Sequence, residues 1–205
     1  MEINSAHCLT SAVMRYSEHC DEPNIDSTQS LGLQGTFQSE LIVLHCVSLP
    51  AGSFGNGAPS RLFTGELDCT EHPEFSSLQG VRVSPHLLID RLGNIEQFVP
   101  FDRGAWHAGS STWKQRPSCN KFSVGIELEG TWDSAFTKSQ YAALTDVCLA
   151  LCSRYPRLSP DNIVGHQEVS PGRKEDPGPH FDWAKLLIPL HRQLYGNRVS
   201  TVSEA

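Results

Sequence analysis

The stretch Gly165–Asp182 reads GHQEVSPGRKEDPGPHFD and gathers a histidine, a lysine and a carboxylate around a proline-rich turn. A proline follows Asp176 directly, and a residue before proline is pushed out of the α region into an extended conformation. If this segment runs extended, Lys174 and Asp176, two positions apart, point to the same side of the chain. A neutral imidazole from His166, a carboxylate and a nearby cation suit a zinc site that holds a polarised carbonyl group. A surface loop rich in turn residues is the alternative, and DPGP taken alone favours it.

The composition limits the classes of protein to consider. With 205 residues, 39% of them hydrophobic and 19% charged, the chain is long enough for one domain with a real core. The net charge of −7, with lysines and arginines scattered, argues against a nucleic-acid-binding protein. No apolar run approaches the roughly eighteen residues of a membrane span, and the N-terminus lacks the basic and apolar regions of a signal peptide. We therefore expect a cytoplasmic protein with no membrane partner.

The cysteines point to the same compartment. There are seven, an odd number, and no CxxC pair occurs among them, so neither a thiolate zinc ribbon nor a thioredoxin-type motif is indicated. Without an export signal, the simplest interpretation is reduced thiols in a cytoplasm.

We expect three parts along the chain. Residues 1–39 lack clear periodicity and are interpreted as an irregular segment that wraps the domain. Residues 40–196 carry the patterns of regular elements and form the domain itself. Residues 197–205 are interpreted as a frayed C-terminal tail.

Two segments have the patterns of strands. Leu41–Val47, LIVLHCV, is a near-continuous apolar run, typical of a strand buried on both faces. Its His45, taken alone, would more often be a satisfied core residue than a metal ligand. Phe122–Gly130, FSVGIELEG, alternates and places Glu127 and Glu129 on its polar face. Alternation usually marks a solvated face, but two glutamates could instead line a cleft, where one could serve as a base.

The remaining patterns predict a hairpin, two helices and one more strand. Residues 84–97 are typical of a hairpin with a glycine in its turn. Residues 137–155 predict the clearest helix, with a capping box at its start and a proline after its end. Residues 163–167 predict a short strand that carries His166, and a final helix is expected over about 183–195.

Two loops have the composition of ligand-binding segments. Ser48–Ser60 is rich in glycine and proline and follows the first strand directly, where α/β folds place their sites. Trp106–Gly109 offers a flat hydrophobic face, a polar group and small residues that let a ligand approach backbone amides. A tryptophan packed within the loop is the alternative there.

Four motifs, in order, resemble one family: VLHCVSLPAGSFG, RVSPHLLIDRLGNIEQFVPFDRGAWHAG, CNKFSVGIELEGT and GHQEVSPGRKEDPGPHFDW. Over roughly residues 40–187 the chain is similar to the AmpD family of cytoplasmic 1,6-anhydro-N-acetylmuramyl-L-alanine amidases, which belongs with the zinc amidases and peptidoglycan recognition proteins. The resemblance implies an α/β (α+β) single domain, with helices flanking a central mixed β-sheet and zinc in a groove at one sheet edge. It also implies cleavage of muropeptides in peptidoglycan recycling, with an influence on β-lactamase induction.

The same resemblance implies roles for individual residues. It makes His45, His166 and Asp176 the zinc ligands, with water in the fourth position. Glu127 matches the family's catalytic glutamate and Lys174 its catalytic lysine. Contacts with the muramyl group and the peptide stem are implied at six positions: Arg82, Trp106, His107, Ala108, Gly109 and Asn120.

Two positions depart from the family pattern. Cys46 stands where close relatives carry asparagine beside the first zinc histidine, and Ser118 stands where an arginine is expected. Neither is a zinc ligand, so the departures bear on affinity for the sugar or the peptide.

The residues themselves support this chemistry. Two imidazoles and a carboxylate leave a zinc ion with net positive charge and an open position, which lowers the pKa of its bound water to about 7. Glu127 would take a proton from that water and Lys174 would neutralise the oxyanion. Two rival classes are an exported or phage-type cell-wall amidase and a non-catalytic peptidoglycan-binding module. The absent export signal argues against the first, and the complete ligand set against the second. We expect a monomer whose partner is a small muropeptide substrate.

Overall fold

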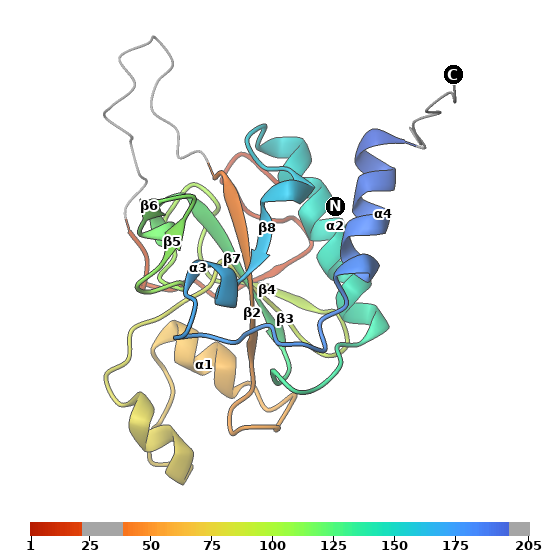
Figure 1. Cartoon of the computed structure of the whole chain (residues 1–205). Coiled ribbons are helices and arrows are strands. Elements are labelled where there is room, and N and C mark those ends of the chain that lie inside the picture. The colour runs from red at the N-terminus through yellow and green to blue at the C-terminus, as the bar shows by residue number, and fades with distance from the viewer. Residues whose placement is uncertain (22–38, 197–205) are drawn as a thin grey trace, which may run out of the picture.

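A six-stranded mixed β-sheet runs through the protein in the order β1-β4-β3-β7-β2-β8 (Figure 1). The computed structural model describes residues 1–21 and 39–196. All neighbouring strands of the sheet are parallel except β3 and β4, which are antiparallel. The expected central mixed sheet is therefore confirmed. Its strands are β1 (Val13–Met14), β2 (Leu41–Val47), β3 (Leu87–Ile89), β4 (Ile95–Gln97), β7 (Ser123–Glu129) and β8 (Ile163–Gly165), while β5 (Thr112–Trp113) and β6 (Arg116–Pro117) form a separate ribbon.

Helices cover both faces of the sheet. The α-helices are α1 (Ala58–Thr64), α2 (Lys138–Arg154), α3 (His166–Val169) and α4 (Trp183–Tyr195), and 3₁₀ helices are formed by Pro73–Leu78, Cys119–Lys121 and Pro160–Asn162. α2 and α4 pack against each other on one side of the sheet, whereas α1 and α3 lie on the other (Figure 1). Within the described ranges, no helix is both long enough and apolar enough to cross a membrane.

Alternation along β2 and β7 divides the core between these two sides. Ile42, Leu44 and Ile126 are fully buried and pack in the core that includes α2 and α4. The intervening residues face the opposite side, because successive side chains of a strand alternate. β2 and β7 are parallel and in register, so His45 lies directly beside Glu127. Glu127 is half-buried and Glu129 is buried, so this face of β7 is not the solvated face that alternation usually marks.

The predicted hairpin and long helix are both confirmed. β3 and β4 pair through Leu87–Ile89 and Ile95–Gln97. At the start of α2, Thr137 Oγ1 accepts a hydrogen bond from the amide of Gln140 at 3.1 Å, and Gln140 Oε1 accepts one from the amide of Thr137 at 3.0 Å. This reciprocal pair is the expected capping box, and it satisfies two amides that the helix itself cannot.

The N-terminal segment is less irregular than expected. Val13–Met14 forms β1 and pairs in parallel with β4 at the edge of the sheet. Leu9 is only 2% exposed and belongs to the core that contains α2 and α4. A strand of two residues is too short to show alternation, which is why periodicity did not predict it. The rest of the predicted irregular segment, residues 22–38, and the predicted tail, residues 197–205, lie outside the described residues.

Candidate active site

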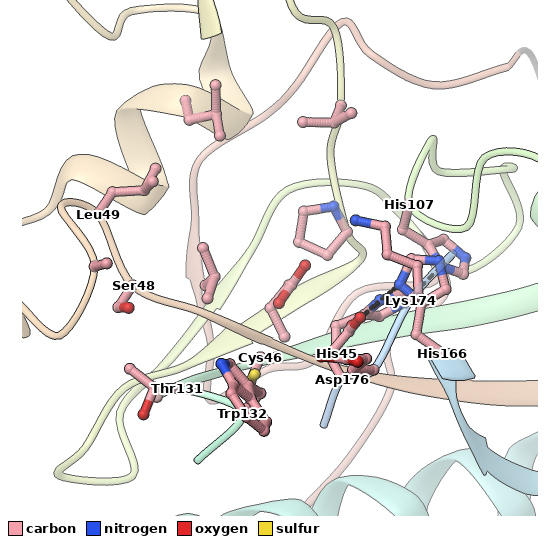
Figure 2. Close-up of a pocket in the computed structure, with 18 of the residues that line it drawn as sticks. His45, Cys46, Ser48, Leu49, His107, Thr131, Trp132, His166, Lys174 and Asp176 are labelled. Atoms are coloured by element: carbon pink, nitrogen blue, oxygen red, sulfur yellow. Dashed lines mark hydrogen bonds and ion pairs between the residues drawn. The ribbon is translucent and has the colours of Figure 1, made fainter. Parts of the chain in front are cut away.

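A cavity of about 1120 Å³ opens beside the ends of β2 and β7 (Figure 2). Its lining includes the end of each strand, the loop that follows β2, and the segment 172–176. The first part of the predicted loop Ser48–Ser60 thus lines the cavity, whereas its last three residues belong to α1. Phe54 and Trp132 also line the cavity and are 40% and 52% exposed. The cavity therefore has exposed aromatic faces in addition to its polar floor.

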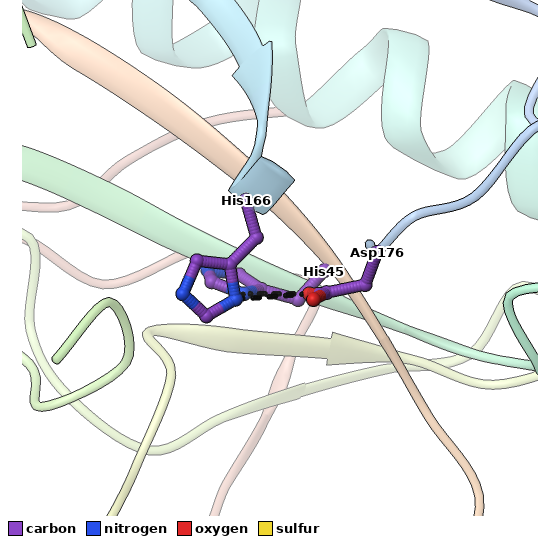
Figure 3. Close-up of side chains that lie close together, drawn as sticks. All are labelled: His45, His166 and Asp176. Atoms are coloured by element: carbon purple, nitrogen blue, oxygen red, sulfur yellow. Dashed lines mark hydrogen bonds and ion pairs between the residues drawn. The ribbon is translucent and has the colours of Figure 1, made fainter. Parts of the chain in front are cut away.

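Three side chains converge at the floor of this cavity (Figure 3). The Nδ1 atoms of His45 and His166 are 2.9 Å apart, and Asp176 Oδ2 lies 3.2 Å from the first and 3.0 Å from the second. The two histidines are buried, and these three residues form a group that could hold a metal ion. Tetrahedral ligands at about 2.0–2.1 Å from zinc are about 3.3–3.4 Å apart. The observed separations of 2.9–3.2 Å are slightly shorter than this spacing, and the donor types are those that zinc binds.

Local backbone contacts bring these ligands together from distant segments. The amide of Gln167 donates to the carbonyl of Asp176 at 3.1 Å, which docks the proline-rich turn onto the start of α3. A Cβ at Gly165 would lie 2.7 Å from Cδ of Pro177, so only glycine allows this approach. The strand predicted over 163–167 ends earlier than expected, because β8 stops at Gly165 and His166 begins α3. The side chain of Glu168 caps that helix by accepting from the amide of Gly165.

The hydrogen bonds of His166 show why this cluster suits a cation. The carbonyl oxygen of Ala108 can only accept, so its 3.1 Å contact with His166 Nε2 places a proton on that nitrogen. Nη2 of Arg173 lies 3.3 Å from the same nitrogen, but it donates at shorter distances to the carbonyls of Ala108 and Ser110 and to the hydroxyl of Ser170. A ring with its single proton on Nε2 presents a bare lone pair on Nδ1, 3.0 Å from the carboxylate oxygen Oδ2 of Asp176. Two acceptor atoms at this distance repel each other unless a cation lies between them. The ligand set is therefore arranged for a bound positive ion.

Burial also sets the charge of these groups. Burial lowers the pKa of His45 to about 4, although the neighbouring Asp176 opposes this change. Burial alone would raise the pKa of Asp176, but the imidazoles of His166 and His45 outweigh it and hold that pKa below its ordinary value. At neutral pH the cluster accordingly offers a neutral imidazole from His45 and an ionised carboxylate, which are the protonation states that a metal requires.

Glu127 lies next to this cluster and has an unusual environment. It lines the cavity, and its buried Oε2 has no hydrogen-bond partner among the described residues. Burial, with a further contribution from the charge of Asp176, raises its pKa well above the ordinary value. A raised pKa makes the carboxylate a stronger base, and an unpartnered oxygen leaves it free to accept a proton.

Lys174 and Asp176 both line the cavity (Figure 2), and so does Glu175 between them, so the three do not alternate as an extended segment would. Its charge opposes the rise in the pKa of Glu127, so the ammonium acts on the glutamate through space. The cavity thus combines a cation, a basic carboxylate and a cluster suited to a metal.

The six residues implied to bind substrate have different surroundings. Trp106 lines the cavity, and its Nε1 donates to Asp21 Oδ1 at 2.9 Å. His107 also lines the cavity, although both of its ring nitrogens have protein partners. Asn120 Oδ1 accepts from the amides of His107 and Ala108 at 3.2 and 2.8 Å, so these amides are engaged within the protein. Four of the six residues lie outside the described lining of the cavity: Arg82, Ala108, Gly109 and Asn120.

The two departures from the family pattern also differ in position. Cys46 lines the cavity, and burial raises the pKa of its thiol, which therefore stays protonated. Ser118 is exposed and has a left-handed backbone at φ 65°, and it lies outside the described lining. Of the two, Cys46 is the one placed to meet a ligand in the cavity.

Sequence reasoning missed two residues that support the site. Arg173 donates to the carbonyls of Ala108 and Ser110. It thereby fixes the loop whose Ala108 carbonyl hydrogen-bonds the ring of His166. No periodic pattern identifies such a contact. Ser123 hydrogen-bonds the ring of His107 at 3.1 Å. Its place on the same face of β7 as Glu127 is a pattern that could have identified it.

Comparison with known proteins identifies relatives over most of the chain. Residues 37–179 match the family model described as N-acetylmuramoyl-L-alanine amidase. The 1,6-anhydro-N-acetylmuramyl-L-alanine amidase AmpD of Citrobacter freundii is 51% identical over 146 residues, which is 71% of this chain and 78% of the relative. A crystal structure of a selenomethionine AmpD derivative superposes with a TM-score of 0.83 at 44% identity, over 91% of this chain and 97% of that chain. The Escherichia coli amidase AmiD, solved with the substrate anhydro-N-acetylmuramic acid-L-Ala-D-γ-Glu-L-Lys, has a TM-score of 0.58 at 26% identity, over 83% of this chain and 65% of that chain.

Proposed function

Because this chain belongs to the N-acetylmuramoyl-L-alanine amidase family, we propose that it hydrolyses the amide bond between (1,6-anhydro-)N-acetylmuramic acid and the L-alanine of muropeptides. The scissile bond joins the lactyl carbonyl of the muramic acid to the nitrogen of L-alanine. One observation carries the proposal: acceptor atoms of His45, His166 and Asp176 face one another at 2.9–3.2 Å, beside a glutamate, Glu127, whose Oε2 has no hydrogen-bond partner among the described residues. Relatives named as 1,6-anhydro-N-acetylmuramyl-L-alanine amidases supply the substrate class.

We propose zinc as the metal that His45, His166 and Asp176 hold. Two imidazole nitrogens and one carboxylate oxygen are a ligand set typical of catalytic zinc, which keeps its fourth position open. When bound there, zinc would supply a Lewis acid and a water with a pKa of about 7. The three protein ligands would hold the ion at the cavity floor, next to the scissile carbonyl of a substrate lying in the cavity.

Glu127 would move the protons of the reaction. Its register beside His45 and its raised pKa allow it to take a proton from the attacking water. The water oxygen bonds to the carbonyl carbon, and Glu127 then passes the proton to the departing nitrogen of L-alanine. General acid–base catalysis of this kind contributes roughly 10²–10⁴-fold.

Lys174 would stabilise the negative charge that forms on the carbonyl oxygen. Its ammonium lines the cavity on the segment that also carries Asp176. A donor placed at a developing oxyanion contributes about 3 kcal/mol in comparable sites. Because this charge is absent from the bound substrate, the contribution falls on kcat more than on KM.

The relatives favour a recycling enzyme. We propose that the protein acts in the cytoplasm on soluble anhydro-muropeptides and, by removing them, lowers the signal for β-lactamase induction. The rival function is an exported amidase that lyses the intact cell wall, and a non-catalytic binding module is the second rival.

Product analysis separates these functions. The protein would be incubated with a soluble anhydro-muropeptide and, separately, with insoluble sacculi, and the products identified by mass. We expect release of stem peptides beginning with L-alanine from the soluble substrate and little release from sacculi. Efficient lysis of sacculi without preference for the anhydro form would indicate the exported class, and no product from either substrate would indicate a binding module.

A further inference from the structure

We propose that His107 and Ser123 form a hydrogen-bond relay that fixes the proton of His45 on Nε2 and so presents the lone pair of its Nδ1 to the metal. The inference rests on the proposed function, because it assigns a role toward the metal that His45 would hold. It makes His107 a positioning residue beneath a ligand, where the family resemblance implied a contact with substrate. Figure 2 shows His107 in the same cluster as His45 and His166.

The relay begins at a backbone carbonyl. Ser123 Oγ donates to the carbonyl oxygen of Cys119 at 2.7 Å, which uses its single proton. A lone pair of the same oxygen therefore faces Nε2 of His107 at 3.1 Å. This contact is a hydrogen bond only if His107 carries its proton on Nε2.

The position of the proton on His107 determines the position of the proton on His45. A neutral imidazole carries one proton, and the contact with Ser123 places that proton of His107 on Nε2. With its one proton on Nε2, His107 presents a bare Nδ1, which lies 2.9 Å from Nε2 of His45. His45 Nε2 must then donate the proton of that hydrogen bond, which leaves Nδ1 of His45 unprotonated. That atom is the one that faces His166 and Asp176.

The strand β7 is built to hold this arrangement. The ring centroids of His45 and His107 are 5.0 Å apart, and the two ring planes are nearly perpendicular, at 80°. A Cβ at Gly125 would lie 2.3 Å from the His107 ring, so the ring occupies the space that a side chain would need. Glycine inside a strand weakens it and marks a close approach of this kind. Alternate positions of β7 thus supply the anchor of the relay at Ser123, the room for it at Gly125, and the proposed base at Glu127.

Two variants of His107 distinguish the effect of its acceptor nitrogen from the effect of its ring shape. His107→Asn removes most of the ring but keeps an acceptor, Oδ1, close to the position of Nδ1. His107→Phe keeps a flat ring of similar size but has no acceptor. If the relay operates, the asparagine variant should bind zinc better than the phenylalanine variant, whereas a role in packing alone would give the opposite order.

The first experiment measures zinc affinity by competition with a chelating indicator at neutral pH. Loss of a group that orients a metal ligand typically costs 10–100-fold in affinity. We expect a loss of that order for His107→Phe and for Ser123→Ala, and a loss of less than about threefold for His107→Asn. Ser17→Ala is the matched control, because Ser17 is also buried and donates to a carbonyl, that of Phe63, outside the relay. It should bind zinc as the wild type does.

The second experiment needs no variant and so does not depend on folding of a mutant. Long-range proton–nitrogen NMR spectra of the zinc-loaded protein report which ring nitrogen of each histidine carries the proton. The relay requires protons on Nε2 of both His107 and His45. A proton on Nδ1 of His107, or wild-type zinc affinity in His107→Phe, would overturn the relay. If the wild type binds zinc and releases L-alanine-headed peptides in that case, the proposed function stands and only the relay fails; if the wild type binds no zinc, both fail.

Discussion

At the scale of single residues, Glu127 and Glu129 show that the surroundings of a glutamate decide whether it serves structure or catalysis. They lie two positions apart on the same face of β7. Glu129 is 5% exposed, and its carboxylate accepts hydrogen bonds from the amides of Gly55 and Arg91 at 2.5 and 3.2 Å. It holds the loops after β2 and β3, whereas Oε2 of Glu127 has no partner among the described residues. Of the two, Glu127 is the one with an oxygen left open to accept a proton from a bound water.

The variant Glu127→Gln should therefore lose activity without losing the metal. Glutamine keeps the size and one acceptor oxygen of glutamate but takes up no proton at neutral pH. We expect kcat to fall about a hundredfold or more, with zinc content unchanged. Glu129→Gln is the matched control, and we expect a small change in kcat with lower stability. Near-normal kcat in Glu127→Gln together with loss of activity in Glu129→Gln would mean that the base is Glu129.

Lys174→Ala should also keep the metal and lose rate. The ammonium matters mainly after the oxyanion has formed, so we expect kcat to fall about a hundredfold with a smaller change in KM. Steady-state kinetics on a soluble muropeptide, with zinc content measured on the same samples, would check this. A rise in KM with unchanged kcat would show instead that Lys174 only binds substrate.

At the scale of elements, the start of α2 ties the helix to the sheet. Thr137 Oγ1 accepts from the amide of Gln140 and donates to the carbonyl of Arg91 at 2.8 Å, just after β3. We expect Thr137→Ala to lower the free energy of unfolding by about 1–2 kcal/mol, because it removes both the cap and this link. Urea denaturation would measure the loss. Thr137→Ser, which keeps the hydroxyl, should lose about 0.5 kcal/mol or less, and equal stability of the alanine variant would contradict the role of the cap.

The elements with a strong periodic pattern were predicted from the sequence, and those without one were not. The apolar run of β2, the alternation of β7 and the helical spacing of α2 each arise from burial that repeats along the segment. β1 is two residues long and carries no period. The end of β8 is set by the capping of α3 and by the contact of Gly165 with Pro177, which involve segments that periodicity does not relate.

The site was predicted from motifs and not from geometry. The resemblance named all three members of the cluster, and the structure brings His45, His166 and Asp176 together. The resemblance could not show that Asn120 Oδ1 accepts hydrogen bonds from the amides of His107 and Ala108, because these contacts depend on how two loops pack together.

At the scale of the whole molecule, buried histidines make stability depend on pH. His86 is fully buried, donates from Nε2 to the carbonyl of Arg103 at 2.9 Å, and accepts from the amide of Gly125 at 3.0 Å. Burial lowers its pKa from 6.5 to about 4. Between these values the unfolded chain binds a proton that the folded protein does not, so the free energy of unfolding falls as pH falls. Burial also lowers the pKa of His45, which likewise reduces the free energy of unfolding as pH falls. The raised pKa of Glu127 has the opposite effect on the free energy of unfolding.

The expected result is a loss of stability on acidification through this window. Urea denaturation of the metal-free protein from about pH 7.5 to about pH 4.5 should show little change above about pH 6.5 and a decline below it. The slope should approach about 1.4 kcal/mol per pH unit for each such histidine. A free energy of unfolding that stays constant or rises as the pH falls through the window would contradict the burial of neutral histidines.

The central claim is that one metal ion, held by His45, His166 and Asp176, makes this protein an amidase. The most direct test is a zinc titration of chelator-treated protein while hydrolysis of a soluble anhydro-muropeptide is followed. We predict no hydrolysis without metal, and recovery in proportion to added zinc up to about one equivalent per chain. Full activity in the metal-free protein, or the same recovery in a variant carrying both His45→Ala and His166→Ala, would contradict the claim.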